Sequence, residues 1–110
     1  MDFELIEDAV GLNPVKSMGQ QLTILPIELD FSGVTSYSTD GEELDLTNHF
    51  NYDENIMVFI TMQDGYLFEY DETAEKVIVY EGDGTDGIAE VDSDTDISAI
   101  GKTSAIALGY

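Results

Sequence analysis

Hydrophobic and polar residues alternate along much of the chain with a period of two, which is the pattern of half-buried β-strands. The clearest alternation lies at residues 27–31 (Ile-Glu-Leu-Asp-Phe), directly after Pro26. Because proline has no backbone N–H to donate, Pro26 inside this apolar run indicates an edge strand or a bulge. The pattern therefore predicts β structure from about residue 20 onward.

Three further segments complete the predicted strands. Residues 66–70 and 76–81 carry alternating aromatic and β-branched side chains around a short polar loop, which predicts a β-hairpin. The continuous apolar run at 56–62 predicts a central strand covered on both faces. Residues 104–110 predict the last strand, with small side chains on one face and Ile106, Leu108 and Tyr110 on the other.

Short strands separated by turns predict an all-β domain, a β-sandwich or jelly-roll-like fold, with one short helical turn at 44–50. The length of 110 residues suits one such domain. We expect residues 21–110 to form the β-sandwich domain and residues 1–20 to form an N-terminal arm or edge strand. The arm either reaches onto a neighbouring subunit or is a frayed end.

The 43% hydrophobic content is ordinary for a folded protein, whereas the charge balance is unusual. The chain has 24 acidic residues, three lysines and no arginine, and its formal net charge is −21. Such a charge repels itself and destabilises the compact state in dilute buffer. In about 1 M salt the Debye length falls to about 3 Å, and most of the repulsion is screened. The composition therefore resembles that of halophilic proteins, and the alternative is an ordinary acidic domain that works in low salt.

The same balance excludes several classes of partner. Without a basic patch the chain cannot neutralise phosphates, which argues against nucleic-acid binding. Anionic membrane surfaces are disfavoured for the same reason. The absence of cysteine excludes disulfides and thiolate metal sites. We expect no nucleic-acid or membrane partner.

Catalytic chemistry has little support in the sequence. His49 is the single histidine, and no serine lies in the Gly-x-Ser-x-Gly setting of a nucleophile elbow. We interpret His49 as a residue of the helical turn. With 24 acids, carboxylate pairs at a suitable spacing arise by chance. The chain is predicted not to be an enzyme, to have no catalytic residues and to need no cofactor.

Two acidic loops are weak candidates for cation binding. Residues 92–96 offer carboxylates at alternate positions, as a calcium loop does, but Ile97 stands where the turn of an EF-hand needs glycine. Residues 81–87 combine acids with flexible glycines. The alternative interpretation for both is a solvated acidic turn. The candidate cation ligands are Asp83, Asp86, Asp92, Asp94 and Asp96.

Several motifs taken together resemble small structural proteins of tailed phages, of the capsid decoration or fibre type. Residues 37–44 (Tyr-Ser-Thr-Asp-Gly-Glu-Glu-Leu) are similar to a Tyr-x-Thr-Gly-Gly-Glu-x-Leu segment of that family. Residues 65–71 (Gly-Tyr-Leu-Phe-Glu-Tyr-Asp) with 76–80 resemble its hairpin, and residues 94–98 its Gly-Thr-Asp-Leu-Ser turn before a final strand. The resemblance covers about residues 27–110, and this chain has Asp40 and Asp94 where the family has glycine.

The resemblance and the composition together imply a virion protein of a tailed virus that infects haloarchaea. It would be a capsid decoration or turret protein, made in the host cytoplasm and assembled as a closed homo-oligomer on the major capsid protein. The other hypothesis is a halophilic carbohydrate- or cation-binding β module. Apolar candidates for contacts between subunits are Phe3, Leu5, Ile6, Met18, Tyr66, Tyr80 and Tyr110, for each of which ordinary core packing is the alternative.

Overall fold

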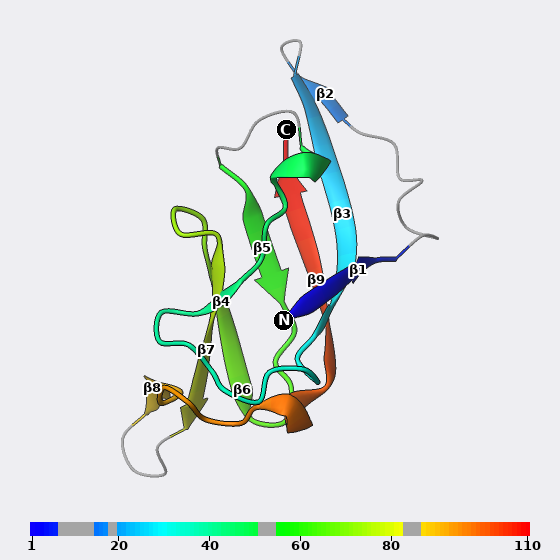
Figure 1. The fold of residues 1–110 in the computed structure, drawn as a ribbon. Helices are drawn as coiled ribbons and strands as arrows, with labels where there is room; N and C mark the ends of the chain where they lie inside the picture. Colours follow the sequence, from blue (N-terminus) through cyan, green and yellow to red (C-terminus); the bar gives the residue numbers. More distant parts are fainter. Residues whose placement is uncertain (7–14, 18–19, 51–54, 83–86) are drawn as a thin grey trace.

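The computed structural model describes residues 1–6, 15–17, 20–50, 55–82 and 87–110, which form two antiparallel β-sheets in a sandwich-like arrangement (Figure 1). This confirms the predicted all-β class. The strands are β1 (Asp2–Leu5), β2 (Val15–Ser17), β3 (Gln20–Asp30), β4 (Glu42–Glu43), β5 (Met57–Ile60), β6 (Tyr66–Asp71), β7 (Lys76–Gly82), β8 (Ile88–Glu90) and β9 (Lys102–Gly109). Two short 3-10 turns, η1 (Thr47–His49) and η2 (Ser98–Ile100), are the helical elements of this part of the chain.

The first sheet has the strand order β1-β3-β9-β5, and β2 also pairs with β3. Its two long central strands, β3 and β9, run side by side in Figure 1, with Thr23 opposite Gly109 at one end and Asp30 opposite Lys102 at the other. β1 and β2 come from the predicted N-terminal arm, and both pair with β3. Residues 2–5 therefore form an edge strand, one of the possibilities that the sequence left open.

The second sheet contains the predicted hairpin. β6 and β7 pair in register from Tyr66 opposite Glu81 to Asp71 opposite Lys76, while β4 and β8 pair with β7. The Asp71 carboxylate accepts hydrogen bonds from the backbone N–H groups of Thr73 and Ala74 in the loop, at 3.0 and 3.1 Å. Acidic side chains are favoured in such turns because they satisfy backbone donors locally.

A single hydrophobic core lies between the sheets. Alternate residues of β3 and β9 point into it, and β7 contributes Val77 and Val79 from the other side. Phe31 stacks on Phe68 across the core with ring centroids 5.1 Å apart. Full burial of an aliphatic or aromatic side chain stabilises a fold by about 1.5–3 kcal/mol, so this alternation decides the register of the central strands.

Pro26 does not lie in an edge strand or at a bulge, so that prediction was wrong. β3 is paired on both sides, and Pro26 lies opposite Ile106 in a continuous register. The carbonyl of Pro26 accepts a hydrogen bond from the N–H of Ile6 on the β1 side, at 3.1 Å. Because the N and C=O of one residue point the same way in an antiparallel strand, the missing donor also faces that side, beyond the last paired residue of β1. Proline is tolerated there without breaking the ladder to β9.

Tyr37 connects the irregular segments to the second sheet. Its side chain is buried, and its hydroxyl donates to Glu90 Oε2 at 2.8 Å and accepts from the backbone N–H of Val79 at 3.1 Å. Its own N–H and C=O pair with residues 95 and 94, both at 2.8 Å. Burial raises the pKa of Tyr37 well above its usual value. The loop after β3, the segment after β8 and strand β7 therefore meet at one side chain.

The predicted helical turn at 44–50 is present as η1. Leu46 and Phe50 on either side of it are buried. The Asp45 carboxylate accepts hydrogen bonds from the N–H of Thr47 at 3.0 Å and from its hydroxyl at 2.6 Å. These bonds hold the pKa of Asp45 below its usual value.

Candidate assembly interface

The outer face of the first sheet, which points away from the core, is divided into an apolar and a polar half. The core-facing positions of β9 are small, so its large side chains lie on the outer face. Two neighbouring rows of residues across this face are entirely apolar. They consist of Pro26, Ile106 and Phe59, and of Ile24, Leu108 and Met57. With Ile6, which lies beside the first row, these seven residues are the apolar half of the outer face.

The side chains of the apolar half are unusually accessible. Met57 and Phe59 are 54% and 56% exposed, and Ile106 between them and β3 is 46% exposed. Four of the six exposed large apolar side chains among the described residues belong to this half. Ile6, Pro26, Phe59 and Ile106 also line a shallow hollow of about 420 Å³. Contiguous exposed apolar surface of this kind marks interaction sites in soluble proteins.

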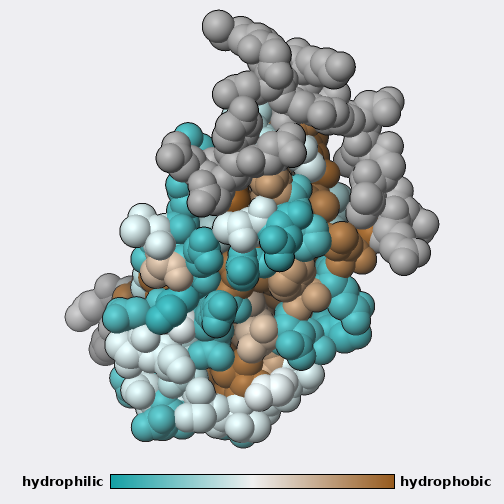
Figure 2. Space-filling model, turned by 45° about the horizontal axis from the view of Figure 1, so that its top comes forward, coloured by the Kyte–Doolittle hydropathy of each residue, from teal (hydrophilic) through white to brown (hydrophobic). Residues whose placement is uncertain are grey.

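The apolar half of the outer face differs in charge from the rest of the chain. On the face drawn in Figure 2, hydrophilic and intermediate residues are mixed over the described part of the chain, with hydrophobic residues showing between them. The chain carries a formal net charge of −21, yet the apolar half contains no ionisable side chain. Water would be displaced from this surface at little electrostatic cost when another protein covers it.

The polar half continues the same strands toward the other end of the face. Its two rows consist of Glu4, Glu28 and Ser104, and of Asp2, Asp30 and Lys102. Lys102 Nζ lies 3.7 Å from Glu28 Oε1, but both groups are exposed, so the pair contributes at most about 1 kcal/mol. Acidic residues on β1 therefore lie directly opposite acidic residues on β3, with one lysine nearby.

The apolar run at 56–62 was wrongly predicted to form a central strand covered on both faces. In the described part of the chain β5 pairs with β9 at the edge of the sheet, and its odd-numbered residues Met57 and Phe59 face outward. A continuous apolar run is ordinarily buried on both sides, which is why its sequence suggested a central position. The sequence feature that indicates an exposed apolar face is in the last strand, where Ile106 and Leu108 share the face opposite the small residues Ala105 and Ala107.

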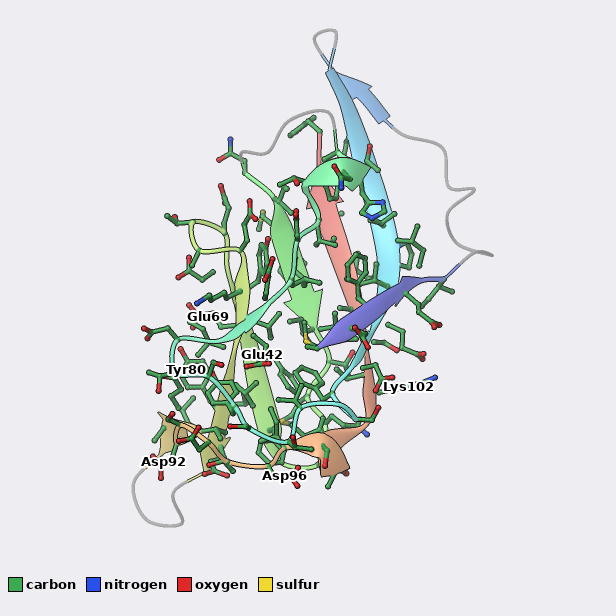
Figure 3. All side chains as sticks on the ribbon, in the orientation of Figure 1. Glu42, Glu69, Tyr80, Asp92, Asp96 and Lys102 are labelled. Carbon is green, nitrogen blue, oxygen red and sulfur yellow. The ribbon has the colours of Figure 1, made fainter. Side chains whose placement is uncertain are left out.

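The structure places the predicted interface residues in different environments. Phe3, Leu5 and Tyr66 are partly buried and pack against the core. Tyr80 is half-buried and donates to Glu69 Oε2 at 3.1 Å, and Figure 3 shows these two side chains close together on the second sheet. Ile6 lies on the apolar half of the outer face. The half-buried Tyr110 follows β9, and Met18 lies outside the described residues.

The cation candidates do not converge in the part of the chain that the structure describes. Asp83 and Asp86 lie outside the described residues. Asp94 accepts from the Ser36 hydroxyl at 3.0 Å. Asp96 accepts from the N–H and hydroxyl of Ser98, which lower its pKa.

Figure 3 shows Asp92 well separated from the Asp96 side chain. Residues 1–6, 15–17, 20–50, 55–82 and 87–110 contain no group of three or more potential metal ligands. The Asp96 carboxylate hydrogen-bonds within its own turn, whereas that of Asp94 joins its loop to Ser36 in the loop after β3.

His49 lies at the end of η1, half-buried, with the ring of Phe3 edge-on to its own at a centroid distance of 5.8 Å. This contact joins β1 to the helical turn. It gives the histidine a packing role in the fold.

The chain matches none of the protein-family models, curated proteins or solved structures with which it was compared. In the described residues, no helix has the length and apolar character needed to span a membrane.

Proposed function

We propose that this chain is a non-enzymatic structural protein of a virus particle, which assembles in concentrated salt through the apolar half of its outer face. The observation that carries the proposal is this surface itself. Three strands and Ile6, which follows β1, present seven apolar side chains on this face of a chain whose formal net charge is −21. An isolated acidic domain gains nothing from such a surface, whereas an assembly protein requires one.

The backbone supports the resemblance to tailed-phage structural proteins. At both positions where that family has glycine and this chain has aspartate, the backbone adopts a positive φ, 73° at Asp40 and 68° at Asp94. Left-handed conformations favour glycine, and aspartate is among the few other residues that tolerate them. The adjacent Gly41 has a φ of 114°, and a Cβ there would lie 2.7 Å from the carbonyl oxygen of Val77. Both departures from the family pattern therefore fall at positions whose backbone in this chain is one that glycine adopts readily.

The composition and the fold support a place on the outside of a capsid. A two-sheet β domain with a single core is stiff enough to be displayed on a shell, and its acidity suits a virion exposed to molar salt. We propose that the partners are further copies of this chain and the major capsid protein. The protein would be a decoration or turret component of a halophilic tailed virus.

Co-sedimentation with capsids of the virus that encodes the chain tests this function. In about 3 M NaCl we expect the purified protein to sediment with capsids that lack it and to saturate at a fixed ratio to the major capsid protein. Protein that stays in the supernatant at every concentration would contradict the proposal. A stoichiometric heat on calorimetric titration with calcium or with glycans would instead favour a binding module.

A further inference from the structure

We propose that the apolar half of the outer face binds the same surface of a second copy of this chain, in a face-to-face dimer with twofold symmetry. The inference rests on the proposed assembly role and names the partner for that surface. A twofold dimer is the smallest closed oligomer, and it uses one self-complementary patch on both subunits.

The area of the apolar half suits such a contact. With Met57, Phe59 and Ile106 each about half exposed, the seven side chains offer on the order of 500 Å² of apolar surface, against about 800 Å² per partner in a standard interface. The remaining area would come from the polar rim, as in most interfaces. The shallow hollow between Pro26, Phe59 and Ile106 can receive side chains of the facing copy.

The distribution of charge also fits a second copy. Among the described residues of β1, β3, β5 and β9, the charged side chains of this face lie in the polar half, at one end of the strands. When the twofold axis lies parallel to the sheets and across the strands, the two apolar halves overlap and the two acidic ends point in opposite directions. A basic partner would find no acidic group among the apolar rows, and in the polar half Lys102 already lies beside Glu28.

Ile106 occupies the centre of the proposed contact. In the register of the sheet it lies between Pro26 on β3 and Phe59 on β5, so each of its neighbours in the row is apolar. Sheets that pack face to face lie about 10 Å apart and interlock their side chains. A carboxylate at this position would be desolvated and would face its symmetry mate, which an apolar interface does not tolerate.

Sedimentation equilibrium in about 3 M NaCl tests the inference with Ile106→Glu, and Ile88→Glu is the matched control. Ile88 on β8 is 58% exposed and belongs to the other sheet, so the control introduces the same charge on a different surface. We expect the wild type and Ile88→Glu to be dimers and Ile106→Glu to dimerise at least about tenfold more weakly. Circular dichroism and thermal unfolding establish that each variant is folded.

If Ile106→Glu does not fold, Phe59→Thr replaces it, because threonine keeps the strand propensity and adds no charge. We expect Phe59→Thr to weaken dimerisation to the same extent. A wild type that remains monomeric, dimerisation that is unaffected in the outer-face variant, or equal loss in the Ile88→Glu control would each overturn the inference. A monomer that still co-sediments with capsids, and loses this binding in the outer-face variant, would overturn self-pairing but leave the proposed function intact.

Discussion

Replacing Tyr37 by phenylalanine is expected to lower the free energy of unfolding by about 2–4 kcal/mol in molar salt. The Tyr37 hydroxyl accepts a hydrogen bond from the buried N–H of Val79 and donates one to the Glu90 carboxylate. Removing it leaves the Val79 donor without a partner, and an unsatisfied buried group costs about 1–3 kcal/mol. The bond to a carboxylate is lost as well, although Glu90 still accepts from the N–H of Asp40 at 2.8 Å. Thermal and denaturant unfolding would measure the change.

The matched control is Tyr80→Phe. The Tyr80 hydroxyl also donates to a carboxylate, that of Glu69, but at an exposed site where water replaces the lost bond. We expect its effect to stay within about 0.5 kcal/mol. Equal effects of the two substitutions would contradict the role assigned to Tyr37 in joining the loops to β7.

Transfer from about 3 M to about 0.05 M NaCl is expected to lower the melting temperature of the wild type by at least about 10 °C. The general cause is the net charge of −21, which is screened only in concentrated salt. The structure adds a local cause, because Glu4 lies opposite Glu28 and Asp2 opposite Asp30 across β1 and β3. Like charges at opposed positions destabilise a pair of strands by about 0.2–1 kcal/mol each. Hydrogen exchange should therefore show β1 opening first as salt is removed.

Two substitutions separate the local cause from the net charge. Glu4→Gln removes one opposed pair of like charges and should raise the melting temperature in low salt by about 2–5 °C. Glu43→Gln removes the same charge, but from a position opposite Lys76, so an attraction between opposite charges is lost as well. This substitution should therefore raise the melting temperature in low salt less than Glu4→Gln does, or lower it. Neither should matter in about 3 M NaCl. A melting temperature independent of salt would show that the acidity does not govern stability.

The elements with regular alternation were predictable from the sequence. The hairpin of β6 and β7, the last strand and the helical turn were placed correctly because each follows a local period or turn signal. The five-stranded order was not predictable, since pairing between β3 and β9 joins residues about 80 positions apart and no local pattern encodes it. Pro26 was misplaced for the same reason, because its tolerance depends on where β1 ends.

The candidate interface was mostly missed. Of the predicted contact residues, Ile6 lies on the apolar half of the outer face, whereas Phe3, Leu5 and Tyr66 pack against the core. Sequence alone could not separate these roles, because an apolar residue in a strand has the same pattern whether it faces the core or a partner. Three strands distant in the sequence had to be aligned before Ile106 and its neighbours formed one surface.

The most direct test of the central claim is the accessibility of position 106 in the assembled state. The chain has no cysteine, so Ile106→Cys and Ile88→Cys each introduce a single thiol. In about 3 M NaCl, with capsids or at high protein concentration, we expect the thiol at 106 to react with a maleimide at least about tenfold more slowly than in the dilute free protein. The thiol at 88 should react at the same rate in both. Equal rates at position 106 in the free and assembled protein would contradict the account.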